Sequence, residues 1–192
     1  MAVISEIYLS LIHNPVYNKN MEVITTTVTN FDLHDIARVS RTYNLDKYYI
    51  VNHLDSQQEF VKKMQNYWSS DFGAEYNSDR QEAFKVVEIK PDLEAVLNEI
   101  EAETGKEPVV IATDARKYEN TIGYKDLRDD IATDQRPYLI LLGTGWGLTQ
   151  EVIEEADYIL EPIYGRGDYN HLSVRSAASI ILDRLVGEEW WR

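Results

Sequence analysis

The chain contains no cysteine among its 192 residues. This excludes disulfide bonds, a cysteine nucleophile and thiolate metal sites, and it fits a reducing cytoplasm, where we expect the protein to reside. The four histidines do not follow the short H-x-x-x-H type of spacing that holds zinc, so we expect no metal. No apolar run approaches the roughly 20 residues of a membrane span. The N-terminus lacks a basic segment, so we expect no secretory signal and no membrane contact.

Basic side chains are also scarce, with 19 Lys and Arg against 33 Asp and Glu, which gives a formal net charge of −14. Nucleic-acid-binding proteins usually carry a basic patch, so the overall charge disfavours that function. The excess of acidic residues is unevenly distributed along the chain, however. Residues 71–135 hold 17 acidic and 8 basic side chains, whereas residues 1–70 hold 7 and 6. One face can therefore be locally basic, while the acidity elsewhere can serve solubility alone.

Apolar, β-branched runs alternate with helical patterns along the chain. Strands are expected at 5–13, 23–29, 47–53, 85–90, 108–113, 137–142 and 157–163, and helices at 32–43, 56–68, 92–103, 124–132, 151–156 and 170–186. The polar segment 69–83 is expected to be a long surface loop. Such alternation predicts an α/β fold with a mainly parallel sheet and helices on both faces. The length favours a single domain over residues 1–192.

The C-terminal third carries the most informative pattern. One apolar run ends at Gly143-Thr144-Gly145-Trp146-Gly147, and a second strand-like run ends at Tyr164-Gly165-Arg166-Gly167. Because glycine has no Cβ, both loops allow backbone groups to approach a ligand closely. Dinucleotide-binding folds also use a G-x-G-x-G loop, but they place it near the start of a βαβ series. Only 45 residues follow Gly147, so the dinucleotide interpretation is disfavoured.

Together, residues 139–148, the run Leu160-Glu161-Pro162-Ile163-Tyr164-Gly165 and the helix start at 171–178 resemble the last two signature motifs of the SPOUT superfamily. These are the α/β-knot RNA methyltransferases, which use S-adenosylmethionine (SAM). The specific matches are Pro162, Gly165, Leu172, Val174 and Ala177. Residues 30–43 resemble the first motif of the superfamily, in which a helix carries an arginine, here Arg38. The whole chain also resembles the domain found alone or fused to bacterial tRNA guanine-N1 methyltransferases.

The resemblance implies a C-terminal trefoil knot whose glycine loops bind SAM, and an RNA substrate, with tRNA expected. It implies Arg38 and Ser173 as catalytic residues. The implied RNA-binding residues are Asn30, Arg41 and Arg175. The implied cofactor-binding residues are Leu142, Gly143, Thr144, Gly145, Ile163, Tyr164, Gly165, Leu172, Ser173 and Ser176. Such sites are completed across a two-fold axis, so a homodimer is expected. Trp190 and Trp191 are expected to pack against the partner subunit or the core.

Departures from the motifs keep other functions open. Ser173 and Arg175 stand where the superfamily has asparagine and serine, and Thr144 or a gap replaces a common glutamate. These changes count against ribose 2′-O methylation. The first hypothesis is a SAM-dependent RNA methyltransferase. The second is a catalytically weak SAM-binding and dimerisation module that acts with a fused or separate tRNA methyltransferase, and the third is an unrelated nucleotide-binding domain. The run Asp114-Ala115-Arg116 follows an expected strand and is either a ligand contact or a loop salt bridge.

Overall fold

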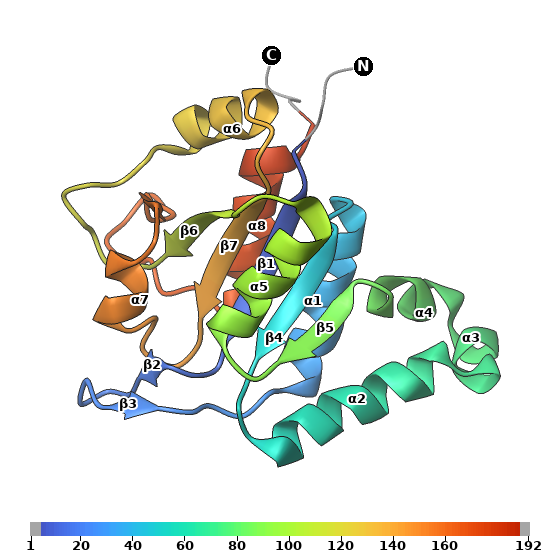
Figure 1. The fold of residues 1–192 in the computed structure, drawn as a ribbon. Coiled ribbons are helices and arrows are strands. Elements are labelled where there is room, and N and C mark those ends of the chain that lie inside the picture. The colour runs from blue at the N-terminus through green and yellow to red at the C-terminus, as the bar shows by residue number, and fades with distance from the viewer. Residues whose placement is uncertain (1–4, 189–192) are drawn as a thin grey trace.

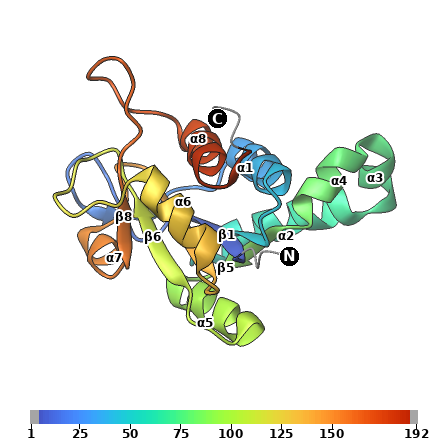
Figure 2. The ribbon, with the colours of Figure 1, turned by 90° about the horizontal axis from the view of Figure 1, so that it is seen from above.

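The computed structural model describes residues 5–188, and six strands of that range form one parallel sheet. The strands lie in the order β5-β4-β1-β7-β6-β8, with β8 labelled beside β6 in Figure 2 and the other strands in Figure 1. Their bounds are β1 (Ile7–Ile12), β4 (Lys47–Val51), β5 (Val87–Lys90), β6 (Val109–Thr113), β7 (Tyr138–Gly143) and β8 (Tyr158–Leu160). A separate antiparallel hairpin consists of β2 (Val16–Tyr17) and β3 (Val23–Ile24).

Helices cover both faces of the sheet, as the alternation of strands and helices predicts. Side chains of α1, α2, α6 and α8 enter the core on one face, and those of α5 and α7 enter the core on the other. Figure 2 shows α1 and α8 side by side, with α2, α3 and α4 extending away from the sheet. The helices are α1 (Asn30–Thr42), α2 (Asp55–Ser69), α3 (Asp71–Tyr76), α4 (Ser78–Phe84), α5 (Leu93–Thr104), α6 (Tyr124–Thr133), α7 (Gln150–Glu154) and α8 (Val174–Val186).

The central strand β1 shows why strands of this sheet can be predicted from the sequence. All six of its residues are buried. Ile7, Leu9 and Leu11 point into the core beneath α1 and α8, while Tyr8 and Ile12 point into the core beneath α5 and α7. A strand covered on both faces is apolar along its whole length rather than at alternate positions.

The strand expected at 23–29 is wrong over most of its length. Within the described chain only Val23–Ile24 pairs, and it pairs with β2 outside the main sheet. The segment that follows is held by hydrogen bonds of another kind. Thr26 donates its backbone N–H to the carbonyl of His13, and its own carbonyl accepts a hydrogen bond from the Asn52 side chain. These bonds hold the segment across the ends of the sheet strands instead of alongside them.

The long loop expected at 69–83 is also wrong, because α3 and α4 occupy it. Each helix begins at a capping side chain. Ser70 accepts from the backbone N–H of Gly73, and Asn77 accepts from that of Arg80. Trp68 and Phe84 are buried beneath these short helices, which therefore form by tertiary packing rather than by length.

The final helix begins at Val174 rather than at residue 170, because Ser173 caps it. The expected packing of Trp190 and Trp191 lies outside the described residues. Between residues 5 and 188, no helix is long and apolar enough to cross a membrane. The same residues contain no group of three or more metal-ligating side chains that could hold a metal ion.

Candidate functional site

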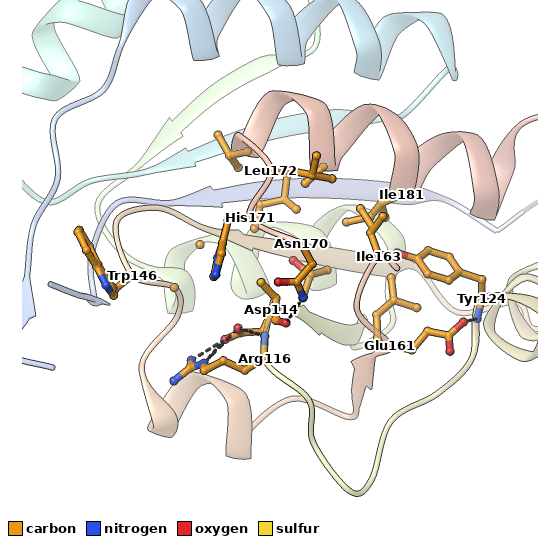
Figure 3. A pocket seen from close by; sticks show the side chains of 18 of the residues that line it. Asp114, Arg116, Tyr124, Trp146, Glu161, Ile163, Asn170, His171, Leu172 and Ile181 are labelled. Carbon is orange, nitrogen blue, oxygen red and sulfur yellow. Dashed lines mark hydrogen bonds and ion pairs between the residues drawn. The ribbon is translucent and has the colours of Figure 1, made fainter. Parts of the chain in front are cut away.

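A cavity of about 320 Å³ lies at the carboxyl ends of β6, β7 and β8 (Figure 3). Ligands of open parallel sheets bind at this edge. Four segments that are distant in sequence meet here: the residues after β6, the glycine loop after β7, the residues after β8 and the start of α8. Their lining residues include Thr113, Asp114, Arg116, Leu142, Gly143, Trp146, Gly147, Glu161, Ile163, Asn170, His171 and Leu172.

One end of the cavity is apolar. Its wall is formed by Leu142, Leu160, Ile163, Ala177 and Ile181. Tyr124 also lines the cavity, and the Arg184 guanidinium lies 4.8 Å from its ring centroid. Burial raises the pKa of Tyr124 to about 12, so its phenol stays neutral at physiological pH. The apolar end can therefore take an uncharged, flat group.

The other end is polar and is organised by Asp114, whose side chain is only 6% exposed. Its carboxylate accepts hydrogen bonds from the backbone N–H and the Nε of Arg116, at 2.8 and 3.1 Å, and from the Tyr118 hydroxyl at 3.3 Å. Hydrogen bonding to this carboxylate raises the pKa of Arg116. Arg116 also donates to the carbonyl of Leu148 at 3.3 Å. The run 114–116 is thus a salt bridge and a part of the cavity wall.

The glycine loop after β7 has a fixed conformation. Gly145 and Gly147 have φ angles of 60° and 99°, a region that favours glycine. A Cβ at Gly143 would lie 2.7 Å from the backbone nitrogen of Leu148. The loop also pairs with the hairpin, because Trp146 donates its backbone N–H to Tyr17 and Gly147 accepts from Tyr17. Larger residues at these positions would displace the loop.

Beneath this loop, Thr26 joins three strand ends. Its hydroxyl lies 2.8 Å from Nδ1 of His13 and 2.5 Å from the Thr144 hydroxyl, which donates to the carbonyl of Ile12 at 2.9 Å. His13 is 1% exposed, and burial lowers its pKa to about 4. The imidazole is therefore neutral at physiological pH, and it supports the loop from inside the protein.

A second, more open hollow of about 550 Å³ lies between α1 and α8. Arg175 spans it, donating to Asp35 at 3.1 Å and lying 3.4 Å from an oxygen of Asp32. The Arg175 guanidinium also sits 5.4 Å from the ring centroid of Phe31. We call this hollow the arginine groove, and its lining is Asp35, Arg38, Val39, Thr42, Ser173, Arg175, Ser176 and Ser179.

The first turn of α8 separates the two hollows. Leu172, Val174 and Ala177 face the cavity, whereas Ser173 and Ser176 face the arginine groove. Ser173 caps the helix by accepting from the backbone N–H of Ser176. A group bound in the cavity and a group bound in the groove would therefore meet across a single helical turn.

The structure brings together only part of the expected site. Of the expected cofactor-binding residues, Leu142, Gly143, Ile163 and Leu172 line the cavity, and Ser173 and Ser176 line the groove. Thr144 and Gly145 hold the glycine loop in place and are not among the residues that line the cavity. Tyr164 and Gly165 lie just beyond Ile163 and are exposed.

The residues expected to contact RNA do not all lie in the same place. Arg38 and Arg175 line the arginine groove. Asn30 is exposed at the start of α1. Arg41 points elsewhere, because its guanidinium donates to Glu82 on α4 and to Asn44. The sequence did not predict Tyr124, Trp146, Glu161, Asn170 or His171 as site residues. The only indication in the sequence was that they lie near a strand end or a glycine loop.

A family of SAM-dependent RNA methyltransferases matches residues 6–187 of the chain. The chain is 45% identical over 179 residues to an uncharacterised protein from Aquifex aeolicus, a match that covers 93% of this chain and 87% of that protein. It is 39% identical over 182 residues to a tRNA (guanine-N(1)-)-methyltransferase from Oleidesulfovibrio alaskensis, covering 95% of this chain and 42% of that protein. The chain thus spans less than half the length of the latter relative.

The fold is shared with the SpoU methyltransferase AviRb from Streptomyces viridochromogenes, solved in complex with the cofactor AdoMet, which is SAM. The TM-score is 0.61 at 18% identity, and the match covers 95% of this chain and 57% of that chain. The chain therefore belongs to the SAM-dependent RNA methyltransferases of the SPOUT superfamily. The expected superfamily, enzyme class and cofactor are confirmed, and the unrelated nucleotide-binding domain is set aside.

Proposed function

We propose that the chain methylates tRNA and holds SAM in the cavity at the ends of β6, β7 and β8. The observation that carries this proposal is the meeting of the glycine loop, the residues after β8 and the start of α8 around one cavity. tRNA is proposed as the substrate because a relative of 39% identity is named a tRNA (guanine-N(1)-)-methyltransferase. The chain covers 42% of that relative, so a partner that supplies further RNA contacts, fused or separate, is part of the proposal.

The residues of the cavity fit this cofactor. Its volume of about 320 Å³ falls within the usual range for small-molecule sites. The apolar wall suits adenine, and Gly143 leaves its backbone accessible. Glu161 and the Asp114–Arg116 pair supply polar groups for the amino, carboxylate and sulfonium ends of the molecule. When bound, SAM supplies a methyl group that is already activated for transfer.

We also propose that residues 161–173 pass through the loop that joins β6 to α6, forming the C-terminal knot. Both ends of this segment contact that loop. Glu161 donates its backbone N–H to Ile122, and Asn170 donates its side-chain amide to the carbonyl of Ala115. A threaded segment held at two points would keep the cavity walls together. Such topology is rare among proteins.

The arginine groove is the proposed acceptor side. Arg38 is positioned to bind an RNA phosphate, since a guanidinium forms paired hydrogen bonds with phosphate oxygens and scarcely deprotonates. Arg175 is already held by Asp35, so its proposed role is to orient Arg38 and RNA across the groove. Ser173, on the turn between groove and cavity, would orient the acceptor group. A homodimer, which the resemblance to the superfamily implies, is also part of the proposal.

Calorimetric titration with SAM and S-adenosylhomocysteine tests the donor site. We expect binding near one site per subunit in the wild-type protein and none in Gly143→Val, because that side chain would collide with backbone at 2.7 Å. Gly167→Val is the matched control, because a Cβ there meets no atom within 4 Å. Failure of the wild-type protein to bind either compound would reject the proposed donor site.

Methyl transfer to unfractionated tRNA separates the enzyme from the catalytically weak module. With labelled SAM, we expect Arg38→Ala to lose turnover while it keeps its affinity for S-adenosylhomocysteine. Lys63→Ala, an exposed change on α2, serves as the charge-matched control. The ion pair between Arg175 and Asp35 favours the weak module, because it occupies one groove cation already. Wild-type protein that binds SAM yet transfers no methyl group, alone or with a partner, would support that second function.

A further inference from the structure

We propose that Trp146 is a stacking platform for an unpaired base of the RNA substrate, at the mouth of the SAM cavity. The inference rests on the proposed function and deepens it, since it assigns the base, rather than the ribose or the phosphate, to the position beside the donor. It concerns a residue between the two glycines of the loop after β7.

Trp146 is exposed in a way that its neighbours do not explain. Its exposed fraction is 60%, whereas Trp68 is 4% exposed. The same side chain lines the cavity, and Figure 3 shows it at the end remote from Tyr124 and Ile181. Indole faces stack well on nucleobases, and an exposed indole that lines a cavity is available for such a contact. The donor cavity therefore opens beside a large free aromatic face.

The backbone that carries this indole is held in place before any ligand arrives. Gly145 and Gly147 on either side have positive φ angles, so the turn is tight. The backbone N–H of Trp146 donates to the carbonyl of Tyr17 at 2.8 Å, and Arg116 donates to the carbonyl of Leu148, two residues further along. The loop backbone therefore loses little conformational entropy on binding, which favours stacking.

Other exposed groups line the same cavity. Met21 is 52% exposed and Leu172 44% exposed, and both line the cavity. His171 lies at this end of the cavity and packs edge-on against Tyr169, with ring centroids 5.6 Å apart. These apolar and aromatic surfaces would cover the edges of a flat ring that lies on the indole.

Charge near the opening also favours RNA. Arg116 keeps 39% of its side chain exposed at the cavity edge. Lys117 beside it is exposed, with its ammonium 5.2 Å from the ring centroid of Tyr164. In a chain of net charge −14, Arg116, which pairs with Asp114, and its neighbour Lys117 bring two cations to the region of a cavity lined by an exposed tryptophan, a combination that suits single-stranded RNA. The phosphates that flank the stacked base would lie against these cations.

The test follows the Trp146 indole N–H by NMR in protein saturated with S-adenosylhomocysteine. The signal is assigned by its loss in Trp146→Phe. We expect GMP, AMP, CMP and UMP to shift this signal at millimolar concentrations, and ribose 5-phosphate to leave it unchanged. A platform that no mononucleotide perturbs, or that ribose 5-phosphate perturbs equally, would overturn the proposal.

Two variants then distinguish stacking of Trp146 on a base from contact of Trp146 with the bound donor. Trp146→Ala should weaken binding of the best mononucleotide by at least about fivefold, and Trp146→Phe should retain most of it, because stacking contributes roughly 1–3 kcal/mol per base. Calorimetry with S-adenosylhomocysteine in both variants and in wild type measures any separate contribution of Trp146 to the donor cavity that it lines. A loss confined to S-adenosylhomocysteine would instead make Trp146 part of the donor site. If wild-type protein binds mononucleotides on Trp146 but not S-adenosylhomocysteine, the stacking site stands and the proposed donor site fails.

Discussion

Thr26 is the residue on which the loop beside the cavity depends most. The direction of its hydrogen bonds follows from chemistry. Since the carbonyl of Ile12 can only accept, the Thr144 hydroxyl donates to it and accepts from Thr26, which in turn accepts from Nδ1 of His13. His13 must then carry its proton on Nδ1. Its Nε2 is buried and finds no partner among the described residues, in keeping with a neutral ring.

Replacing Thr26 by valine should loosen the glycine loop. The change keeps the side-chain shape but removes the hydroxyl that His13 and Thr144 share, leaving buried polar groups unpaired at a cost of about 1–3 kcal/mol. We expect affinity for S-adenosylhomocysteine to fall roughly tenfold, as measured by calorimetry. Thr27→Val, an exposed change at the next position, is the control. Equal affinity in the two variants would contradict a supporting role for Thr26.

His13 should also make stability depend on pH. Its pKa falls from 6.5 to about 4 on folding, so the unfolded chain takes up a proton at a higher pH than the folded protein does. The stability contributed by the neutral ring is complete above pH 6.5, and it is lost as the pH falls from 6.5 towards 4. The loss over that window is about 3 kcal/mol, because each pKa unit corresponds to about 1.4 kcal/mol.

Urea unfolding at pH 7.5 and pH 4.5 measures this effect. We expect His13→Gln to lose less stability on acidification than wild type does, by about 2 kcal/mol or more. His53→Gln, at an exposed position, should behave as wild type. His34, whose pKa is also lowered by burial, is present in all three proteins and cancels in the comparison. Parallel pH profiles for wild type and His13→Gln would disprove the assignment.

At the scale of elements, the arm formed by α2, α3 and α4 depends on a close contact. Gly73 in α3 is buried, and a Cβ there would lie 2.4 Å from the Tyr67 carbonyl oxygen and 3.0 Å from Cα of Trp68. Both contacts are with backbone, which cannot move without opening the α2–α3 corner. The corner in turn supports the edge-on packing of Trp68 with Tyr67 and His34.

Gly73→Ala should therefore destabilise this arm. We expect faster amide hydrogen exchange over residues 66–84 and a loss of about 1–3 kcal/mol in the free energy of unfolding. Gly167→Ala, with no atom within 4 Å of the added Cβ, is the matched control. Exchange that rises equally throughout the sheet would mean that the arm and the sheet unfold as one unit.

The elements also show what the sequence could and could not predict. Strands β4, β5, β6 and β7 were expected within a few residues of their true bounds. β4 and β7 are nearly continuous apolar runs because they are buried on both faces, whereas the edge strand β5 alternates apolar and charged residues. The short helices α3 and α4 were missed since six or seven residues show little periodicity, and a buried aromatic cluster rather than sequence pattern holds them.

For the same physical reason, only some residues of the candidate site could be predicted from the sequence. Its glycine loops were predicted because glycine marks the required backbone conformation within a few consecutive residues. Tyr124, Glu161 and Asn170 could not be selected, because their place in the cavity depends on how residues 114–123 pack against residues 161–170. That packing joins segments dozens of residues apart, and no local pattern encodes it.

At the scale of the whole molecule, the cavity couples ligand binding to folding. Its walls come from β6, β7, β8 and α8, which meet only in the folded chain. At 100 times its dissociation constant, S-adenosylhomocysteine should add about 2.7 kcal/mol to stability, equivalent to a rise in Tm of roughly 5–10 °C. Thermal unfolding with increasing ligand measures the shift. It should be absent in Gly143→Val and present in Gly167→Val, and a shift of equal size in both would point to binding elsewhere.

The position of β1 also governs how the chain can be made. This strand is the first to be synthesised, yet it lies between β4 and β7, and β7 ends only at Gly143. One edge of this buried and mostly apolar strand therefore remains without a neighbour until residues up to Gly143 have been synthesised. Open edges of this kind pair readily with other chains, and distant strand pairings form slowly. Protection of the nascent chain during translation, and not the stability of the finished fold, should therefore limit the yield of this enzyme in the cell.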